Sequence, residues 1–446
     1  MRIIPYFVLL LLFYVPVSQA QVQSLSLEEA IRIGLENSID LERARHNVER
    51  AKISQNDAEM DFLPNLNSNI SGSRGLGRQF DQEALGFVNQ SVTSLSSNIQ
   101  SNVTLFNGFR NINALRQSRA GVESSEERYQ RSRERVIFEV SSAYLQVLLN
   151  QNLLQITKDN VETAQKQLQQ VEAQVEVGMR PVVDLFNQQA ALANAELQAI
   201  RSENTLNISI TNLIGILRLD PLSDYDFVSP DIDAESITPQ NIDLATLVDQ
   251  AMQNRSDLRA TELDIAMQRY NLEIARGARY PTLSANASVS TSYRDTNPFD
   301  FSDQFWDQNI NRGVGMSLSI PIFTRFSIRN NIQRQQLAYK DAKLDLDALK
   351  IGVFQEVRQA YNDYIGLSKE LEATSAAFRA AERAFETEQE RYNVGSATLI
   401  ELTEANNRFV QAQTDKIIAE YQFVFQEKLL EFYLGRLTEE IALQNL

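Results

Sequence analysis

The side chains best placed to do chemistry in this chain are three carboxylates that follow two glycine turns. Asp184 lies six residues after Gly178, and Glu401 lies six residues after Gly395. Glu404 follows Glu401 at the spacing that puts two side chains on one face of a helix. Clustered carboxylates attract cations without a cofactor. The competing interpretation is structural, because acidic residues in a first helical turn are stabilised by the helix dipole and cap free N–H groups.

The composition excludes most catalytic and metal-binding chemistry. The chain of 446 residues contains one histidine, His46, and no cysteine, which rules out a His/Cys metal cluster and disulfides. No Ser/His/Asp triad, phosphate-binding loop or dinucleotide-binding glycine motif is supported. We expect His46 on a helix surface, and we expect no enzyme activity, metal or other cofactor. A periplasmic enzyme is the least favoured interpretation, because it would need a constellation of residues that the sequence lacks.

The start of the chain and its charge indicate an exported protein without a nucleic-acid partner. Arg2, the apolar run over residues 7–15 and the small residues up to position 20 predict a secretory signal peptide over residues 1–20. The 42 basic and 58 acidic residues give a formal net charge of −16, which argues against binding to nucleic acid.

Nearly the whole mature chain is written twice with a constant offset. Pro64 recurs as Pro281, an offset of 217 residues (281 minus 64). Other pairs keep the same offset, among them Leu27/Leu244, Asn37/Asn254, Phe106/Phe323, Ala143/Ala360, Tyr144/Tyr361 and Leu185/Leu402. We therefore expect a first repeat over residues 21–219 and a second over 242–446. A linker over 220–241 with one short strand near residues 225–228 separates them.

Each repeat is expected to open with an amphipathic helix and to continue into a much longer one. The opening helices are predicted over about 26–60 and 243–278, with interruptions at Asn37 and Asn254. Residues 109–177 contain no proline and a single glycine, so they can form one helix of roughly 65 residues, about 100 Å long. A helix of that length is typical of a coiled coil. Apolar residues seven apart support this seam: Val140, Val147, Leu154, Val161 and Leu168, and in the second repeat Val357, Tyr364, Leu371, Phe378 and Phe385.

Tight turns end the long helices and lead into return helices predicted over 182–218 and 399–436. Glycine adopts the left-handed conformation that ends a helix, as expected at Gly178 and Gly395. Thr398 and Glu401 have the spacing of a capping box.

Two strands are expected between the opening and the long helix of each repeat. In the second repeat, residues 283–291 and 314–322 alternate apolar and polar side chains. The first repeat is weaker, with Leu66 and Ile70 and then Val103 and Leu105. Strands of about 8–12 residues with one apolar face suit a transmembrane β-barrel. Aromatic residues near the second pair would suit a membrane interface: Tyr293, Phe299, Phe301, Phe305 and Trp306.

Four strands cannot close a barrel alone, because about eight is the practical minimum and an open edge is not tolerated in lipid. The chain is therefore expected to oligomerise through its strands. The fold class that follows is an α+β membrane protein. In it a trimeric 12-stranded barrel, with four strands per chain, continues into a long α-helical coiled-coil barrel.

The signal peptide, duplication, paired strands, proline-free helices and V-G-x-x-x-[LIV]-x-[DE]-[LV] turns together resemble the TolC-type outer-membrane efflux protein family. The resemblance covers essentially the whole mature chain. It implies a homotrimeric exit duct in the cell outer membrane that extends into the periplasm and serves tripartite efflux or type I secretion. It also implies a periplasmic adaptor (membrane fusion) protein and an inner-membrane pump of the RND or ABC type as partners, besides outer-membrane lipid.

The resemblance assigns roles to residues of this chain. The adaptor-docking tips match Val177-Gly178-Met179 and Val394-Gly395-Ser396, and the aperture carboxylates match Asp184, Glu401 and Glu404. The helix–strand junctions match Pro64, Pro281 and Pro321. A well-known family member carries an arginine where this chain has Ala397, so the closure network of the pore is expected to differ, with Arg180 as a candidate substitute. The alternative function is a secreted coiled-coil structural or adhesive protein, which would leave the strand pairs unexplained.

Overall fold

The structure, a computed structural model, describes residues 23–81, 85–228 and 243–443. The signal peptide predicted over residues 1–20 and residues 229–241 of the predicted linker lie outside these ranges. The chain divides into two compact units, and each takes segments from both repeats. The first contains the described residues of 1–39, 133–251 and 356–446, and the second contains those of 40–132 and 252–355.

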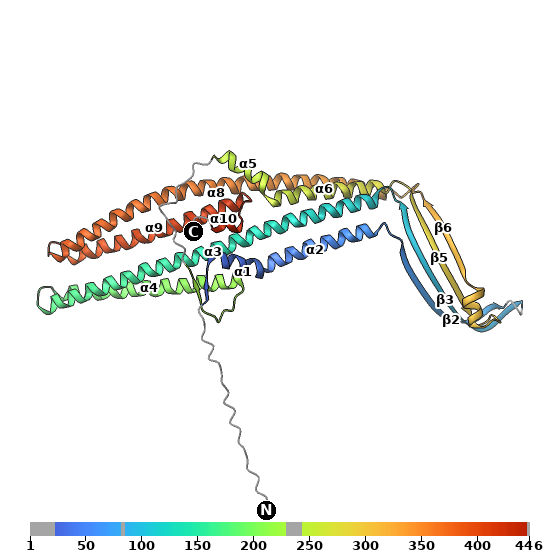
Figure 1. Cartoon of the computed structure of the whole chain (residues 1–446), viewed down its shortest axis with the longest axis horizontal. Coiled ribbons are helices and arrows are strands. Elements are labelled where there is room, and N and C mark those ends of the chain that lie inside the picture. Colours follow the sequence, from blue (N-terminus) through green and yellow to red (C-terminus); the bar gives the residue numbers. More distant parts are fainter. Residues whose placement is uncertain (1–22, 82–84, 229–242, 444–446) are drawn as a thin grey trace, which may run out of the picture. The chain divides into compact units, whose positions relative to one another are not determined.

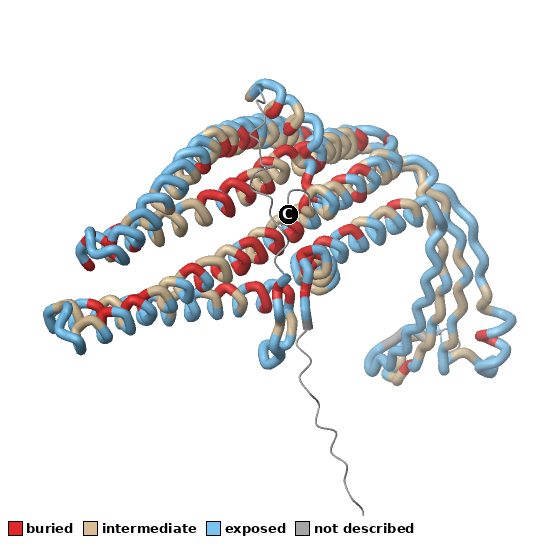
Figure 2. The backbone as a smooth tube through the Cα atoms, turned by 60° about the vertical axis from the view of Figure 1, so that its left-hand side comes forward, coloured by how far each residue is buried: buried red, intermediate tan, exposed pale blue. Residues whose placement is uncertain are grey.

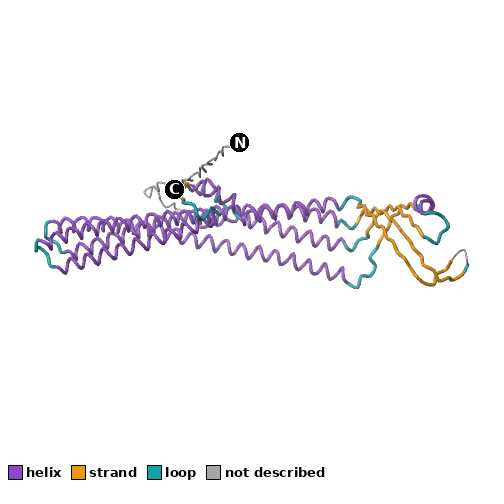
Figure 3. Tube along the Cα trace, turned by 90° about the horizontal axis from the view of Figure 1, so that it is seen from below, coloured by secondary structure: helices purple, strands orange, loops and turns teal. Residues whose placement is uncertain are grey.

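The second unit contains an antiparallel sheet to which each repeat contributes two strands. Its order is β2 (Asn65–Asp81), β3 (Gly86–Phe106), β5 (Thr282–Arg294) and β6 (Asn311–Ser319). The four strands lie side by side in Figure 1 and form one continuous sheet, orange in Figure 3. The two repeats meet where β3 pairs with β5, so β2 and β6 are the edges of the sheet in the described chain.

The strand lengths correct the sequence prediction. Strands β2 and β3 contain 17 and 21 residues rather than 8–12. Their polar side chains hide the alternation, and the continuous β2–β3 pairing fixes the extended backbone along the whole hairpin. Strand β6 ends at Ser319 instead of reaching residue 322, because Pro321 has no N–H group to extend the ladder.

One face of the sheet is apolar and the other is polar. Residues paired across antiparallel strands point to the same face, so the ladder sorts the side chains. The apolar face includes Leu66, Ile70, Leu95, Ile99, Val103, Ala287, Val289, Val314, Met316 and Leu318. The polar face includes Asn69, Ser71, Ser73, Ser96, Asn98, Gln100, Ser288, Ser290, Gly315 and Ser317. All nine residues of β6 are exposed, and Figure 2 shows the strands mostly pale blue and tan.

The remaining elements of the second unit are helical. Helices α2 (Ile39–Met60) and α6 (Ser256–Gly277) lead into the two strand pairs, and α3 (Arg110–Glu176) and α8 (Ser327–Asn393) begin after them. Between β5 and β6 lie two short helices that the sequence did not predict, α7 (Phe301–Asp303) and η1 (Gln304–Gln308). They hold part of the aromatic group expected near the strand ends, with the rings of Phe301 and Phe305 stacked 5.0 Å apart.

The first unit contains the remaining helices and a small parallel sheet. Its helices are α1 (Leu27–Asn37), α4 (Val182–Leu217), α5 (Leu244–Asn254), α9 (Leu399–Tyr433) and α10 (Glu439–Leu443), together with most of α3 and α8. The predicted interruptions at Asn37 and Asn254 are confirmed. Strand β4 (Tyr225–Phe227), expected from sequence, pairs with the unpredicted β1 (Gln23–Leu25). The buried Tyr144 hydroxyl lies 2.9 Å from the carbonyl oxygen of Leu25 and holds this sheet against α3.

The predicted long helices are confirmed, each with 67 residues. The heptad seam is buried at Val140, Val147 and Leu154 in α3, and at the matching positions of α8. In the described part of the chain, none of the helices carries an apolar stretch sufficient to cross a membrane.

Candidate gate and docking site at the helix turns

Both long helices end in the same backbone motif. Gly178 and Gly395 have φ angles of +76° and +78°, the left-handed region that favours glycine. The Gly178 N–H donates to Val175 (2.9 Å), and the Met179 N–H donates to Gln174 (2.8 Å). The second turn repeats this pattern one offset later, so both are Schellman turns. Each glycine is needed for its backbone conformation, since a Cβ at either position would meet nothing within 4 Å.

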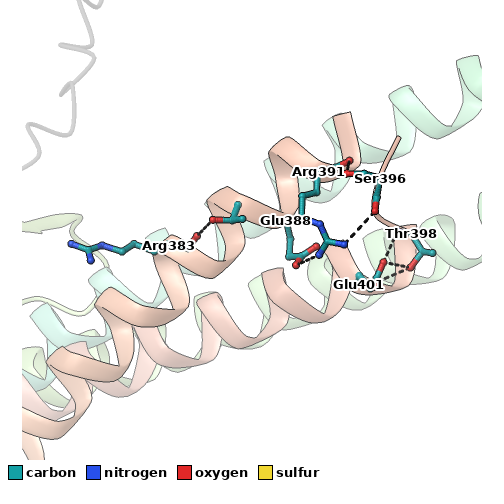
Figure 4. A network of polar contacts seen from close by, with 7 residues as sticks. Arg383, Glu388, Arg391, Ser396, Thr398 and Glu401 are labelled. Carbon is teal, nitrogen blue, oxygen red and sulfur yellow. Dashed lines mark hydrogen bonds and ion pairs between the residues drawn. The ribbon is translucent and has the colours of Figure 1, made fainter. Parts of the chain in front are cut away.

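The second turn is held by the capping box predicted from its sequence (Figure 4). The Thr398 N–H donates to the Glu401 carboxylate at 2.7 Å, and the Glu401 N–H donates to the Thr398 hydroxyl at 3.3 Å. These hydrogen bonds hold the pKa of the Glu401 carboxyl below its usual range. On the preceding helix, Arg391 bridges Glu388 (2.6 Å) and the Ser396 carbonyl oxygen (3.3 Å). The second hairpin therefore has its own internal polar network.

An apolar cluster packs the two helical hairpins together close to their turns. The first hairpin, α3–α4, contributes Val171 with Val175 and Leu185, and the second, α8–α9, contributes Tyr392, Ala397, Leu399, Leu402 and Phe385. Ala397 is only 9% exposed. The position at which a known family member has arginine is therefore part of the apolar core in this chain.

Arg180 connects the same two hairpins by a charged contact. Its guanidinium carbon lies 4.6 Å from the centroid of the Tyr392 ring, and its Nη1 lies 3.4 Å from the Asp184 carboxylate. Burial raises the pKa of the Tyr392 phenol, with the Arg180 charge opposing that rise. The phenol oxygen is buried without a hydrogen-bond partner among the described residues. The cation–π contact is therefore the polar interaction that joins the aromatic ring to the first hairpin.

The three predicted aperture carboxylates have different surroundings. Asp184 is largely buried beside Arg180, whereas Glu401 and Glu404 are exposed on α9. Glu404 pairs with Arg408 one helical turn further on. The structure thus places Glu401 and Glu404 together on one exposed helix face, and it separates Asp184 from them by pairing it with arginine. Glu404 has no capping role, so its position is not explained by helix termination.

The turns also expose large apolar side chains to solvent. Val177, Met179 and Val394, all among the predicted docking residues, are 68%, 77% and 80% exposed. Val182, Val183, Phe186 and Ile400 extend these surfaces into the return helices and are also exposed. Ser396, by contrast, is tied to its own turn through its hydroxyl, which donates to the Arg391 carbonyl oxygen at 3.1 Å.

The predicted junction prolines lie between helices and strands. Pro64 and Pro281 directly precede β2 and β5, and Pro321 follows the end of β6. Proline ends a helix and cannot donate to a ladder, so these positions suit helix–strand boundaries.

The described residues contain no group of three or more His, Cys, Asp or Glu side chains placed to hold a metal ion. His46 is exposed, as expected, 3.2 Å from Glu42 on the preceding turn of α2.

Sequence reasoning missed Tyr392 and the role of Arg180 as its partner. A lone tyrosine three residues before the turn glycine gives a weak signal, because the matching position in the first repeat is Val175. The contact joins residues more than 200 positions apart, which no local pattern specifies.

Comparison with known proteins gives matches over both repeats. A family model described as "Outer membrane efflux protein" matches residues 30–217 and 247–436. The outer membrane protein TolC of Vibrio cholerae serotype O1 is 24% identical over 383 residues, covering 79% of this chain and 85% of that protein. TolC of Escherichia coli K12 is 22% identical over 413 residues, covering 89% and 81%. The solved structure of the CmeC outer membrane channel of Campylobacter jejuni aligns with a TM-score of 0.77 at 18% identity, covering 94% of this chain and 89% of that one.

Proposed function

The chain belongs to the outer membrane efflux protein family, and from that premise we propose that three copies form one exit duct. Each copy contributes its four strands to a 12-stranded barrel in the outer membrane, and the long helices form a coiled-coil tube in the periplasm. The two repeats, over residues 21–219 and 242–446, serve as two similar sectors of this tube. The duct is passive, so a partner supplies the energy for export.

The family establishes the core of this assignment: the chain is an outer-membrane efflux channel, and members of its family are channels rather than enzymes. The alternative of a secreted coiled-coil structural or adhesive protein is not supported, because the family model matches nearly all of both repeats.

The observation that carries the trimer is the open four-stranded sheet. Its apolar face is exposed at Val314 (89%), Leu66 (76%) and Met316 (68%) in a single copy. Lipid would cover that face, but it would not satisfy the free N–H and C=O groups of the edge strands β2 and β6. Further copies must therefore pair with both edges. Three copies give 12 strands with polar side chains facing an aqueous lumen.

We infer that the pore narrows at the two helix turns. In a trimer, Glu401 and Glu404 would place six carboxylates around one mouth, which favours cations over anions. Arg180 and Tyr392 would hold the two hairpins of each chain together in the narrow state. The capping function of Glu401 does not compete with this proposal, since an ionised carboxylate can cap a helix and contribute its charge to the mouth.

We further propose that the exposed apolar turns dock a periplasmic adaptor protein, with an inner-membrane pump of the RND or ABC type behind it. Val177, Met179 and Val394 form a small apolar surface next to the turn glycines. Exposed apolar groups of this kind mark interaction sites when they lie together and are rimmed by polar residues.

Native mass spectrometry of the detergent-purified protein tests the assembly, with three chains as the expected result. A stable folded monomer would contradict the barrel. Planar-bilayer recording of the same preparation tests the duct, and the expected result is a cation-selective conductance that divalent cations block from the side carrying the turns.

A further inference from the structure

The sequence offset of 217 residues also governs hydrogen-bond register in the sheet. Within the first repeat, Asn65 pairs with Asn102. Adding the offset to both residues gives Thr282 and Ser319, which pair with each other in the second repeat. The same holds along all of the shared ladder, so the two strand pairs have identical registers after the offset is applied.

The pairing between repeats occurs only once in a single chain. Strand β3 pairs with β5, for example through Gln100 and Ser288. Moving Gln100 forward by the offset gives Ser317 in β6, and moving Ser288 back by it gives Ser71 in β2. These two strands are the edges of the sheet in the described chain, so the equivalent pairing requires another copy.

We propose that β6 of one copy pairs with β2 of the next in the register of the β3–β5 junction, so that Ser317 pairs with Ser71 of the partner subunit. This proposal rests on the trimer proposed above and specifies its seam. The same rule pairs Ser319 with Asn69, Gly315 with Ser73, Gly313 with Gly75, Val314 with Arg74, Met316 with Gly72 and Leu318 with Ile70, the second of each pair being of the partner subunit.

The two faces of the sheet support this register independently. Met316, Leu318 and Ile70 lie on the apolar face, whereas Ser317, Ser319 and Ser71 lie on the polar face. The proposed seam pairs apolar-face residues with one another and polar-face residues with one another. A slip of one residue would put every side chain of the incoming strand on the wrong face. The remaining alternatives are slips of two residues, which the faces alone do not exclude.

The contact is head-to-tail, because β6 meets β2 rather than a second β6. Such an interface uses two different surfaces of each copy and closes into a ring when the rotation permits. A C₂ dimer through identical edges would instead leave one edge strand of every copy unpaired, which lipid does not tolerate.

The equivalence is limited to the strands. In the chain, Gly108 and Gly277 approach so closely that a Cβ on Gly108 would lie 2.3 Å from the Gly277 carbonyl oxygen. The matching positions at the seam between copies are Arg325 and Met60, both with side chains. The helices next to that seam therefore stand further apart than α3 and α6 do within a chain.

Disulfide crosslinking tests the register, and the absence of cysteine from the chain removes any background. Directly paired side chains have Cβ atoms about 4.5–5.5 Å apart, close to disulfide geometry, whereas a slip of two residues moves them by about 7 Å. The variant is Ser71→Cys with Ser317→Cys, both on the polar face and accessible to a soluble oxidant. The matched control is Gln100→Cys with Ser288→Cys, the equivalent pair within one chain.

Oxidation of Ser71→Cys/Ser317→Cys trimers should give covalent dimers and closed covalent trimers on denaturing gels, whereas the control pair should give only monomers. Each single-cysteine variant should stay monomeric on the gel. The pair Gly315→Cys with Ser73→Cys should behave like the first pair, and it serves if the first does not assemble.

Preferential crosslinking of Ser317→Cys to Asn69→Cys or Ser73→Cys would overturn the register while leaving the trimer intact. Dimers from Ser317→Cys alone would show that identical edges pair and would overturn the head-to-tail seam. Native mass spectrometry before oxidation separates these outcomes from failure of the proposed function, which would appear as an absence of trimers.

Discussion

Replacing Arg180 with alanine should loosen the contact between the two helical hairpins while leaving each hairpin folded. The Arg180 guanidinium lies 4.6 Å from the centroid of the Tyr392 ring, and it is the charged link from the first turn to the second hairpin. The apolar cluster around Tyr392 stays in place in this variant, so the change removes one interaction rather than the interface.

The size of the effect follows from the burial of the two side chains. The Arg180 side chain is 19% exposed and Tyr392 is 4% exposed, so the cation–π contact is mostly shielded from water. Such a contact contributes about 1–2 kcal/mol, compared with about 0.5–1 kcal/mol at an exposed site. A loss of that size changes a two-state population by a factor of about 5–30. If the three chains of a trimer open together, the losses add to about 3–6 kcal/mol, which corresponds to more than 100-fold.

Single-channel recording in planar bilayers measures this shift as an increase in open probability. Arg391→Ala is the matched control, because Arg391 binds Glu388 and Ser396 within its own hairpin and should leave the open probability near that of the wild type. Arg180→Lys keeps the charge and should give an intermediate value. An open probability in Arg180→Ala equal to the wild-type value, or equal changes in Arg180→Ala and Arg391→Ala, would refute the assignment of Arg180 as the link between hairpins.

Three further predictions concern the turns and the strand-to-helix junction. Glu401→Gln with Glu404→Gln should reduce cation selectivity and divalent block, and unchanged conductance properties would remove both from the gate. Because hydrogen bonds lower the folded-state pKa of Glu401, its stabilisation is present above pH 4.5 and lost as pH falls through the lower folded value, so Glu401→Gln and wild-type melting temperatures should converge in acid. Gly395→Pro should abolish export yet leave trimers in the membrane, whereas surviving export would argue against docking at this turn. Gly108→Ala, at φ +69° and 2.3 Å from a backbone oxygen of α6, should lower stability by more than ~2 kcal/mol, whereas Gly352→Ala, with nothing within 4 Å, should be tolerated in thermal melts.

The helical part of the fold could be predicted because its signals are local. The absence of proline, the seven-residue apolar spacing and the turn glycines specify helices of 67 residues and where they end. The capping box of Thr398 and Glu401 is a contact over three residues, and it forms as its spacing predicts.

The strands were predicted less well because their backbone conformation depends on partners. Strands β2 and β3 consist largely of serine, asparagine and glycine, which have low strand propensity, and they extend well past the predicted lengths. The same limit applies to β1, whose three residues become a strand through pairing with β4.

The sequence by itself determined the duplication, the long helices, the turn positions and the family resemblance, because each is encoded in residue type at fixed spacing. The tertiary structure decided which segments far apart in the chain meet: β3 with β5, β1 with β4, and Arg180 with Tyr392. Such contacts depend on how whole elements pack and on which faces remain uncovered. Spacing within one segment carries no information about a partner that lies 200 residues away.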